Sequence, residues 1–346
     1  MLHVSTGAPD SSERRGVAES EPIFAALDLG TNNCRLLIAS PQSASEDPAM
    51  SRVGGLRVFD SFSRVVRLGE GVSSTGLLSD EAMERTIIAL KACQKKISRY
   101  NLTDSRFVAT EACRRAENGY DFLNTVRNEI GMDIDIISTE DEAKLAFTGC
   151  SSLLTGDSKK AVVFDIGGGS TELMWVDVEN GKTITDWLSV GFGVMNLSDK
   201  FGGSNLADMA FSDMVSTLVD RLKHFDVANK ISQTIEGTNV QLLSTSGTVT
   251  TLAAIHLDLP RYDRSKIDGI TLSVKDIRAT TKRLLDMKQY ERFNHPCIGA
   301  DRADFILSGC AIFEAISTLW PTQNITIADR GVREGIILSL LEKNNS

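Results

Sequence analysis

The sequence predicts an α/β protein built from two related halves, and three observations support this fold class. The length of 346 residues suits two domains of ordinary size, each able to bury its own core. Strand-like and helix-like segments alternate along much of the chain, which is typical of layered α/β structures. A short pattern, an apolar strand ending in D-[LI]-G and followed by a second apolar strand, occurs twice.

The two copies of this pattern are separated by a constant distance. The later copy, VFDIGGGSTELMWV, spans Val163 to Val176, and its apolar residues on either side of the glycines predict two strands. Its residues lie 137 positions after their counterparts in FAALDLGTNNCRLLIA; the matched pairs are Asp28 and Asp165, Gly30 and Gly167, Arg35 and Glu172, and Leu36 and Leu173. A constant offset of domain length indicates an internal repeat.

The three glycines from Gly167 to Gly169 predict a turn that brings backbone N–H groups close to a ligand, as in phosphate-binding loops. Asp165 and Glu172 flank this turn, and carboxylates beside a phosphate commonly hold a divalent cation. A tight β-hairpin without a ligand is the alternative interpretation of the glycine triplet alone. Because the pattern occurs twice, two such turns facing each other could hold both sides of a phosphate chain.

The other elements of the N-terminal half follow from periodicity and helix caps. Residues 79–100 predict a helix with Ser79 as its N-cap and an apolar face; the face consists of Met83, Ile87, Leu90 and Ile97. Around this helix we predict, in chain order, a strand within 54–71, a strand at 105–110, a helix at 120–131 closed by Gly131, a strand at 132–138 and a helix at 140–154.

The C-terminal half alternates in the same way. Asn180 and Gly181 between alternating segments predict a hairpin. Residues 303–320 predict an apolar core helix, and residues 324–343 predict a strand, a turn and a helix.

Residues 240–257 predict a strand, a turn of small residues and a helix. The start of this helix, with Ser246, Gly247 and Thr248, suits phosphate or ribose contacts. Simple N-capping by Ser246 or Thr248 is the alternative, since it happens at most helices.

The composition limits the classes of function. Apolar residues make up 42% and charged residues 24%, as in globular proteins, and no apolar run approaches the roughly 20 residues that span a bilayer. A net charge of −9 and the lack of interleaved basic and aromatic residues argue against a nucleic-acid partner. An anionic ligand must therefore be held locally; the candidate cations are Arg64, Arg67, Arg114, Arg115 and Lys144.

The first 21 residues contain no apolar segment and predict a disordered tail. The chain has six cysteines without a C-x-x-C pair and only four histidines, which argues against a zinc site or a disulfide framework. A reducing compartment suits this cysteine usage, so we predict a cytoplasmic protein.

Six segments resemble, in order and at similar spacing, the motifs of the exopolyphosphatase and guanosine pentaphosphate phosphohydrolase family; they are AALDLGTNN, ATEACRRAENGYDFL, IISTEDEAKLAFTG, VVFDIGGGSTEL, STSGTVTTLAA and ADRGVREGIIL. The resemblance covers residues 22–345. It implies an actin-like fold of two ribonuclease-H-like domains with the active site in the cleft between them. We therefore expect domain I to comprise 22–140 with the C-terminal helix 330–346, and domain II to comprise 141–329.

The resemblance also implies a catalytic base, a glutamate at the start of the helix that joins the domains. In STEDEAKLAF this residue is Glu142. Position alone is ambiguous, because the helix dipole stabilises any acid in the first turn of a helix. Glu140 and Asp141 are the alternative bases, and Glu111 is a weaker candidate.

Phosphoryl-transfer chemistry suggests roles for the remaining candidates. Arg114 matches a family arginine that contacts substrate phosphate. The residues expected to cradle one phosphate are Gly167, Gly168, Gly169, Ser170 and Thr171, with Thr31 and Asn32 opposite them. Mg²⁺, or another divalent cation, is expected on Asp28, Asp165 and Glu172.

The expected reaction is hydrolysis of the terminal phosphoanhydride of inorganic polyphosphate, with release of orthophosphate. Guanosine pentaphosphate, which would give guanosine tetraphosphate, is a second expected substrate. Two alternatives stay open: an actin-like ATP-dependent kinase, and a regulator that binds guanosine tetraphosphate without turnover. Family members resemble dimers, so a homodimer without nucleic-acid or membrane partners is expected.

Overall fold

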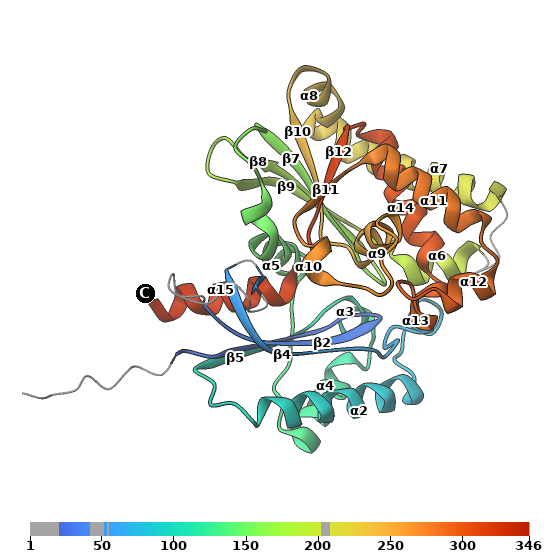
Figure 1. Cartoon of the computed structure of the whole chain (residues 1–346). Coiled ribbons are helices and arrows are strands. Elements are labelled where there is room, and N and C mark those ends of the chain that lie inside the picture. Colours follow the sequence, from blue (N-terminus) through green and yellow to red (C-terminus); the bar gives the residue numbers. More distant parts are fainter. Residues whose placement is uncertain (1–20, 42–51, 54, 202–207, 346) are drawn as a thin grey trace, which may run out of the picture.

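The computed structural model describes residues 21–41, 52–53, 55–201 and 208–345, and these residues form two six-stranded sheets, one in each half of the fold (Figure 1). The disordered tail predicted for residues 1–21 lies, apart from Glu21, outside the described residues. Glu21 pairs with Arg57 at 2.9 Å. Helices pack against both sheets, which confirms the predicted α/β class.

The first sheet has the strand order β3-β4-β2-β1-β5-β6. Its strands are β1 (Phe24–Leu29), β2 (Asn33–Pro41), β3 (Arg52–Val53), β4 (Leu56–Val65), β5 (Asp104–Ala109) and β6 (Asp135–Ile136). Strand β1 pairs antiparallel with β2 and parallel with β5. The last strand is shorter than the segment predicted at 132–138.

The second sheet repeats this arrangement, with the order β11-β12-β10-β7-β8-β9. Its strands are β7 (Lys160–Ile166), β8 (Thr171–Asp177), β9 (Thr183–Val190), β10 (Val240–Ser244), β11 (Ile270–Ser273) and β12 (Asn324–Ile327). Strand β7 pairs antiparallel with β8 and parallel with β10, as β1 does with β2 and β5. Asp28 faces Arg35 in one sheet and Asp165 faces Glu172 in the other, so the repeat of the sequence is also a repeat of register.

Helices cover both faces of the first sheet (Figure 1). The helices of this half are α1 (Val72–Thr75), α2 (Asp80–Ile97), α3 (Glu111–Arg115) and α4 (Gly119–Ile130). Alternate residues of β1 point to opposite faces, so that Ala25 and Leu27 pack towards α2 and α4, whereas Phe24 and Ala26 pack towards the C-terminal helix. Ser79 caps α2 as predicted, because its hydroxyl accepts from the N–H of Ala82 at 3.3 Å.

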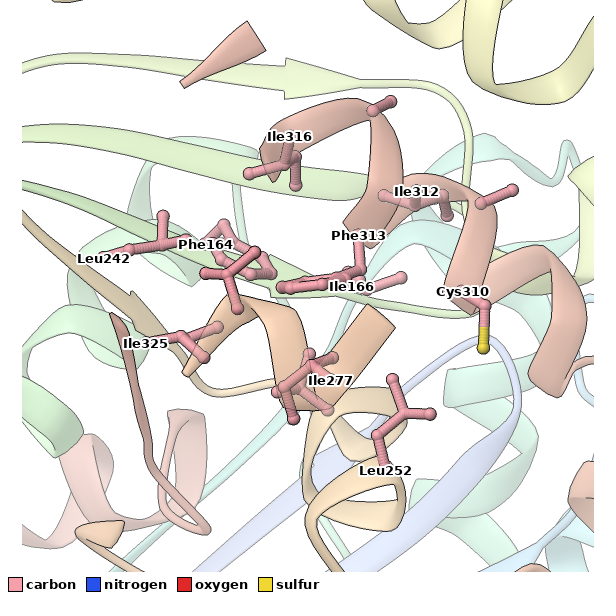
Figure 2. Packing of buried hydrophobic residues seen from close by; sticks show 14 of the residues in the cluster. Phe164, Ile166, Leu242, Leu252, Ile277, Cys310, Ile312, Phe313, Ile316 and Ile325 are labelled. Carbon is pink, nitrogen blue, oxygen red and sulfur yellow. The ribbon is translucent and has the colours of Figure 1, made fainter. Parts of the chain in front are cut away.

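The second half contains the larger core. Its helices are α6 (Val194–Phe201), α7 (Asp208–Asn229), α8 (Ile231–Gly237), α9 (Gly247–His256), α10 (Arg264–Ile267), α11 (Val274–Asp286), α12 (Gln289–Asn294), α13 (Ala300–Ala303) and α14 (Ile306–Leu319). Figure 2 shows Phe313 of α14 beside Phe164 and Ile166 of β7. The core helix predicted for 303–320 begins at Ile306, and the separate turn α13 precedes it.

Two helices cross where the chain passes between the halves. They are α5 (Thr139–Cys150), which leads through a 3₁₀ turn (Ser151–Leu153) into β7, and α15 (Val332–Asn345), which packs on the first sheet (Figure 1). A Cβ on Gly149 would overlap the carbonyl of Gly331, and a Cβ on Gly335 would overlap that of Leu145. Only glycine at these two positions lets the two backbones approach so closely.

Two further properties concern the chain as a whole. Within the part of the chain that the structure describes, no helix combines the length and the apolarity needed to cross a bilayer. All six cysteines are free and buried; they are Cys34, Cys93, Cys113, Cys150, Cys297 and Cys310.

Candidate active site

The two repeated turns follow β1 and β7 and line one cleft between the halves of the fold. This cleft is open to solvent. The predicted site residues that line it are Asp28, Thr31, Asn32, Glu142, Asp165, Gly167, Gly168, Gly169, Ser170, Gly247 and Thr248. Tertiary structure thus gathers most of the predicted candidates from both halves onto one surface.

Four predicted residues lie behind this surface: Arg114, Thr171, Glu172 and Ser246. The Thr171 hydroxyl donates to the carbonyl of Phe192 at 2.7 Å. Ser246 is the N-cap of α9, because its hydroxyl accepts from the N–H of Thr248 at 3.0 Å. Capping, one of the two roles left open for Ser246, is therefore present, and the start of α9 with its positive dipole end faces the cleft.

The glycine turn presents backbone N–H groups to the cleft. Its ends are joined by a 2.9 Å hydrogen bond from the N–H of Gly167 to the carbonyl of Ser170. The carbonyls of Gly167 and Gly168 accept from the N–H groups of Val194 and Met195 at 3.0 and 2.9 Å. Because the C=O and the following N–H of a planar peptide point in opposite directions, the N–H groups of Gly168 and Gly169 point away from α6. In the described parts of the chain neither N–H has a backbone or side-chain acceptor, which leaves both for a ligand.

Glu142 lies in the first turn of α5 and is largely buried. Burial raises the pKa of Glu142 well above its usual value, and the nearby charge of Glu172 adds to the shift, while Arg114 opposes it. A carboxylate of this kind is a stronger base than an exposed one. The alternative bases point elsewhere, since Glu140 pairs with Lys144 at 2.6 Å and Asp141 accepts from the hydroxyl of Ser138.

Arg114 sits behind Glu142 rather than in the cleft. Its Nη2 donates to Glu142 at 3.2 Å and to Glu111 at 2.8 Å, and its Nη1 donates to the carbonyl of Ile137 at 2.7 Å. In this arrangement the guanidinium orients Glu142. Glu111, the weaker candidate, lines the cleft and shares the same arginine.

Acidic side chains are crowded beneath the cleft. Burial raises the pKa of Asp28 and of Asp165, and Arg35 opposes the shift in both. Burial also raises the pKa of Glu172 to about 7, against the hydrogen bond from Ser170. Crowded buried carboxylates of this kind favour either protonation or a bound cation.

Asp28 and Asp165, with the amide of Asn32, are groups in the cleft that could hold a divalent cation. The Asn32 Oδ1 is buried and has no hydrogen-bond partner among the described residues. Amide oxygens coordinate hard cations or accept hydrogen bonds from their bound waters. Glu172 is less available, since its Oε1 accepts from the hydroxyls of Ser170 and Ser189 at 2.6 and 3.0 Å. Within the described ranges no cluster of three acidic, histidine or cysteine ligands occurs. The donor set fits Mg²⁺, which commonly uses one or two carboxylates together with waters and substrate phosphates.

Two arginines that line the cleft are missing from the sequence-based prediction of ligand contacts. Arg35 pairs with Asp28 on the neighbouring strand and lines the cleft. Its position in the repeat, equivalent to that of Glu172, was the signal in the sequence that could have indicated it. Arg302 lies in α13, where its Nη1 donates to the hydroxyl of Thr251 at 2.9 Å and burial lowers its pKa. No sequence motif around Arg302 indicates a ligand contact.

The other predicted cations lie outside the cleft. Arg67 stacks on the ring of Phe305 at 5.4 Å, and Arg64 stacks on Phe62 at 5.3 Å. Arg115 lines a smaller neighbouring cavity. The arginines that line the cleft, Arg35 and Arg302, are half-buried, which suits a net acidic protein that holds an anion locally.

The unliganded protein is expected to become more stable when the pH falls from about 8 to about 5. Raised folded-state pKa values mean that the folded protein binds more protons than the unfolded chain in this window, by about 1.4 kcal/mol per pH unit for each proton. For Glu172 the gain develops as the pH falls through about 7 and is complete near its ordinary pKa. His295, whose pKa burial lowers, acts in the opposite direction. Urea unfolding at several pH values, in the presence of a metal chelator, measures the free energy of unfolding of the unliganded protein.

The matched variant for this experiment is Glu172→Gln, which keeps the shape of the side chain and removes its proton. We expect this variant to lose part of the pH dependence, and added Mg²⁺ to flatten the dependence in the wild type. If the free energy of unfolding fell steadily as the pH was lowered from 8, the raised pKa values of these carboxyl groups would be contradicted.

Comparison with known proteins gives consistent results. The model of the Ppx/GppA phosphatase family matches residues 49–344. A curated relative, the bifunctional 3-dehydroquinate synthase/phosphatase of Fusobacterium nucleatum, is 29% identical over 325 residues, which cover 92% of this chain and 46% of that protein. The chain thus spans about half the length of this relative.

Solved structures are similar over nearly the whole chain. The Aquifex aeolicus member of the Ppx/GppA family is 26% identical with a TM-score of 0.74, and the match covers 94% of this chain and 99% of that one. An exopolyphosphatase from Cytophaga hutchinsonii, 23% identical, has a TM-score of 0.81 with 93% and 98% covered. At 23% identity, the similarity to the Cytophaga hutchinsonii protein shows a shared fold.

Proposed function

Because the chain belongs to the Ppx/GppA phosphatase family and is therefore a hydrolase, we propose that it removes the terminal phosphate of inorganic polyphosphate and releases orthophosphate. Guanosine pentaphosphate is proposed as a second substrate, since it presents the same phosphoanhydride end. The observation that carries the proposal is the placement of a buried glutamate, Glu142, in a cleft between two turns that offer hydrogen-bond donors.

The reaction needs a base, donors for the phosphate oxygens and a way to neutralise charge. In the proposed mechanism Glu142 accepts the proton of the attacking water, and Arg114 keeps its carboxylate in place through the 3.2 Å contact. The N–H groups of Gly168 and Gly169 bind the oxygens of the terminal phosphate, with Thr31 and Asn32 on the opposite side. Donors that are fixed before the substrate arrives stabilise the developing charge without reorganisation.

Arg35 and Arg302 are proposed to hold the next phosphates of the chain. Both line the cleft, and a guanidinium forks onto phosphate oxygens with two parallel hydrogen bonds. A bound Mg²⁺ would neutralise charge on the phosphate oxygens. Asp28 and Asp165 would hold it, with the Asn32 amide nearby.

The test is orthophosphate release by the purified protein with Mg²⁺, with long-chain polyphosphate, short-chain polyphosphate, guanosine pentaphosphate and ATP offered in parallel. We expect release from polyphosphate, and the ranking of the four identifies the preferred substrate. Release from none of them would reject the proposal, and binding without release would favour a regulator. Phosphate transfer from ATP to an acceptor would favour the kinase alternative.

We also propose that the protein forms a homodimer and that a groove across both subunits guides long chains. Light scattering combined with a processivity assay tests this. A monomer that digests long chains processively would contradict it.

A further inference from the structure

Asn196, in the first turn of α6, contacts the glycine turn and is not among the residues that line the cleft. Its Nδ2 donates to the carbonyl of Gly169 at 2.7 Å, across 27 positions of the sequence. The same nitrogen donates to the carbonyl of Gly191 at 2.9 Å, and the Oδ1 accepts from the N–H of Gly193 at 2.7 Å. Both ends of the amide are therefore used, and only one orientation of the amide satisfies all three partners.

With the hydrogen bond to Gly169, the carbonyls of all three glycines in the turn are held by α6. The carbonyls of Gly167 and Gly168 are held by backbone N–H groups of α6, and the carbonyl of Gly169 is the third and is held by a side chain. The peptide that joins Gly169 to Ser170 is planar, so a carbonyl turned towards Asn196 turns the N–H of Ser170 towards the cleft. Within the described ranges no backbone or side-chain acceptor takes this N–H.

The Asn196 amide is the hydrogen-bond donor that holds the Gly169 carbonyl. Beside the turn lies a small cavity, lined by Gly168, Gly169 and Asn196 among others. Gly169 has no side chain of its own to anchor the peptide, and the hydrogen bond from the Asn196 amide opposes rotation of the peptide. At Gly193, in contrast, the backbones touch, because a Cβ there would overlap Gly168.

We propose that Asn196 is a positioning residue for this site: it holds the Gly169 carbonyl away from the cleft and thereby aims the Ser170 N–H at the terminal phosphate. The inference rests on the proposed function, since it assumes that a phosphate occupies the cleft. Asn196 is not among the residues that line the cleft. It acts through the peptide that it orients.

The test uses Asn196→Ala and Asn196→Asp. Alanine removes the donor, and aspartate sets a carboxylate against the carbonyl oxygens of Gly169 and Gly191. We expect Asn196→Ala to weaken orthophosphate binding about 10-fold, the scale of one hydrogen bond to a charged group, and to lower kcat by about 100-fold with a smaller change in KM. Asn196→Asp is expected to show a larger loss of orthophosphate affinity and a larger decrease in kcat than Asn196→Ala.

Asn229→Ala is the matched control. Its Nδ2 also makes two hydrogen bonds, to Asp186 at 2.7 Å and to the carbonyl of Phe225 at 3.1 Å, but it lies outside the residues that line the cleft. We expect this variant to keep wild-type orthophosphate affinity and kcat. A folded Asn196→Ala protein that binds orthophosphate and turns over like the wild type would overturn the proposal.

A second measurement needs no variant and no turnover. In a titration of the wild-type protein with orthophosphate and Mg²⁺, followed by NMR, the Ser170 amide resonance is expected to shift as the ligand binds. An unchanged Ser170 resonance would overturn the inference even if a variant failed to fold. Since binding is measured apart from catalysis, a protein that binds orthophosphate through Ser170 but hydrolyses none of the four substrates would reject the proposed function and leave the role of Asn196 supported.

Discussion

Replacing Glu142 with glutamine is expected to slow orthophosphate release at least ~100-fold while the affinity for orthophosphate stays at the wild-type level. Glutamine keeps the shape of the side chain and its hydrogen bond from Arg114, but it cannot accept the proton of the attacking water. Burial raises the pKa of Glu142, so the wild-type residue is a stronger base than an exposed glutamate. Single-turnover rates and calorimetric binding of orthophosphate measure the two quantities separately.

Glu140→Gln is the control for this prediction. Glu140 lies on the same turn of α5, is exposed and pairs with Lys144, so its loss is expected to leave turnover unchanged. Near-normal turnover of Glu142→Gln would reassign the base. Glu111 would then be the first residue to test, because it lines the cleft and contacts the same arginine.

Replacing Gly335 with alanine is expected to reduce the free energy of unfolding by about 1–3 kcal/mol, the usual cost of overpacking, and to slow turnover as well. The new methyl group would overlap the Leu145 carbonyl, so α5 and α15 would have to separate at their crossing. Glu142 lies three residues before Leu145 on α5 and would move with it. Chemical denaturation and orthophosphate release by the same preparation measure both effects.

Gly237→Ala provides the matched substitution. Gly237 is the last residue of α8, and a Cβ there meets only open space. We expect its free energy of unfolding to stay within about 1 kcal/mol of the wild-type value, with any change in the stabilising direction. If Gly335→Ala were equally well tolerated, the close approach of α5 and α15 could not be a determinant of stability or of the position of Glu142.

Much of the fold could be predicted from sequence because its determinants are local. The structure confirms the cap of α2 at Ser79. Of the predicted apolar face, Leu90 is buried, while Met83, Ile87 and Ile97 are partly buried against the same core. The constant offset between Asp28 and Asp165 predicted equivalent strand ends, and the register of the two sheets confirms it. The helices from Val194 to Gly237 were not predicted, since no motif of the sequence analysis falls there.

The sequence by itself determined the α/β class, the internal repeat and the candidates that stand at strand ends, since alternation, glycines and caps act over a few residues. Only the tertiary structure decided which side chains meet. It placed Arg114 behind Glu142 and Asn196 against Gly169, and it brought Arg302 into the cleft. None of these contacts joins residues within one element of the chain. Contacts of this kind depend on how the two halves and their helices pack, and no local pattern in the sequence records that packing.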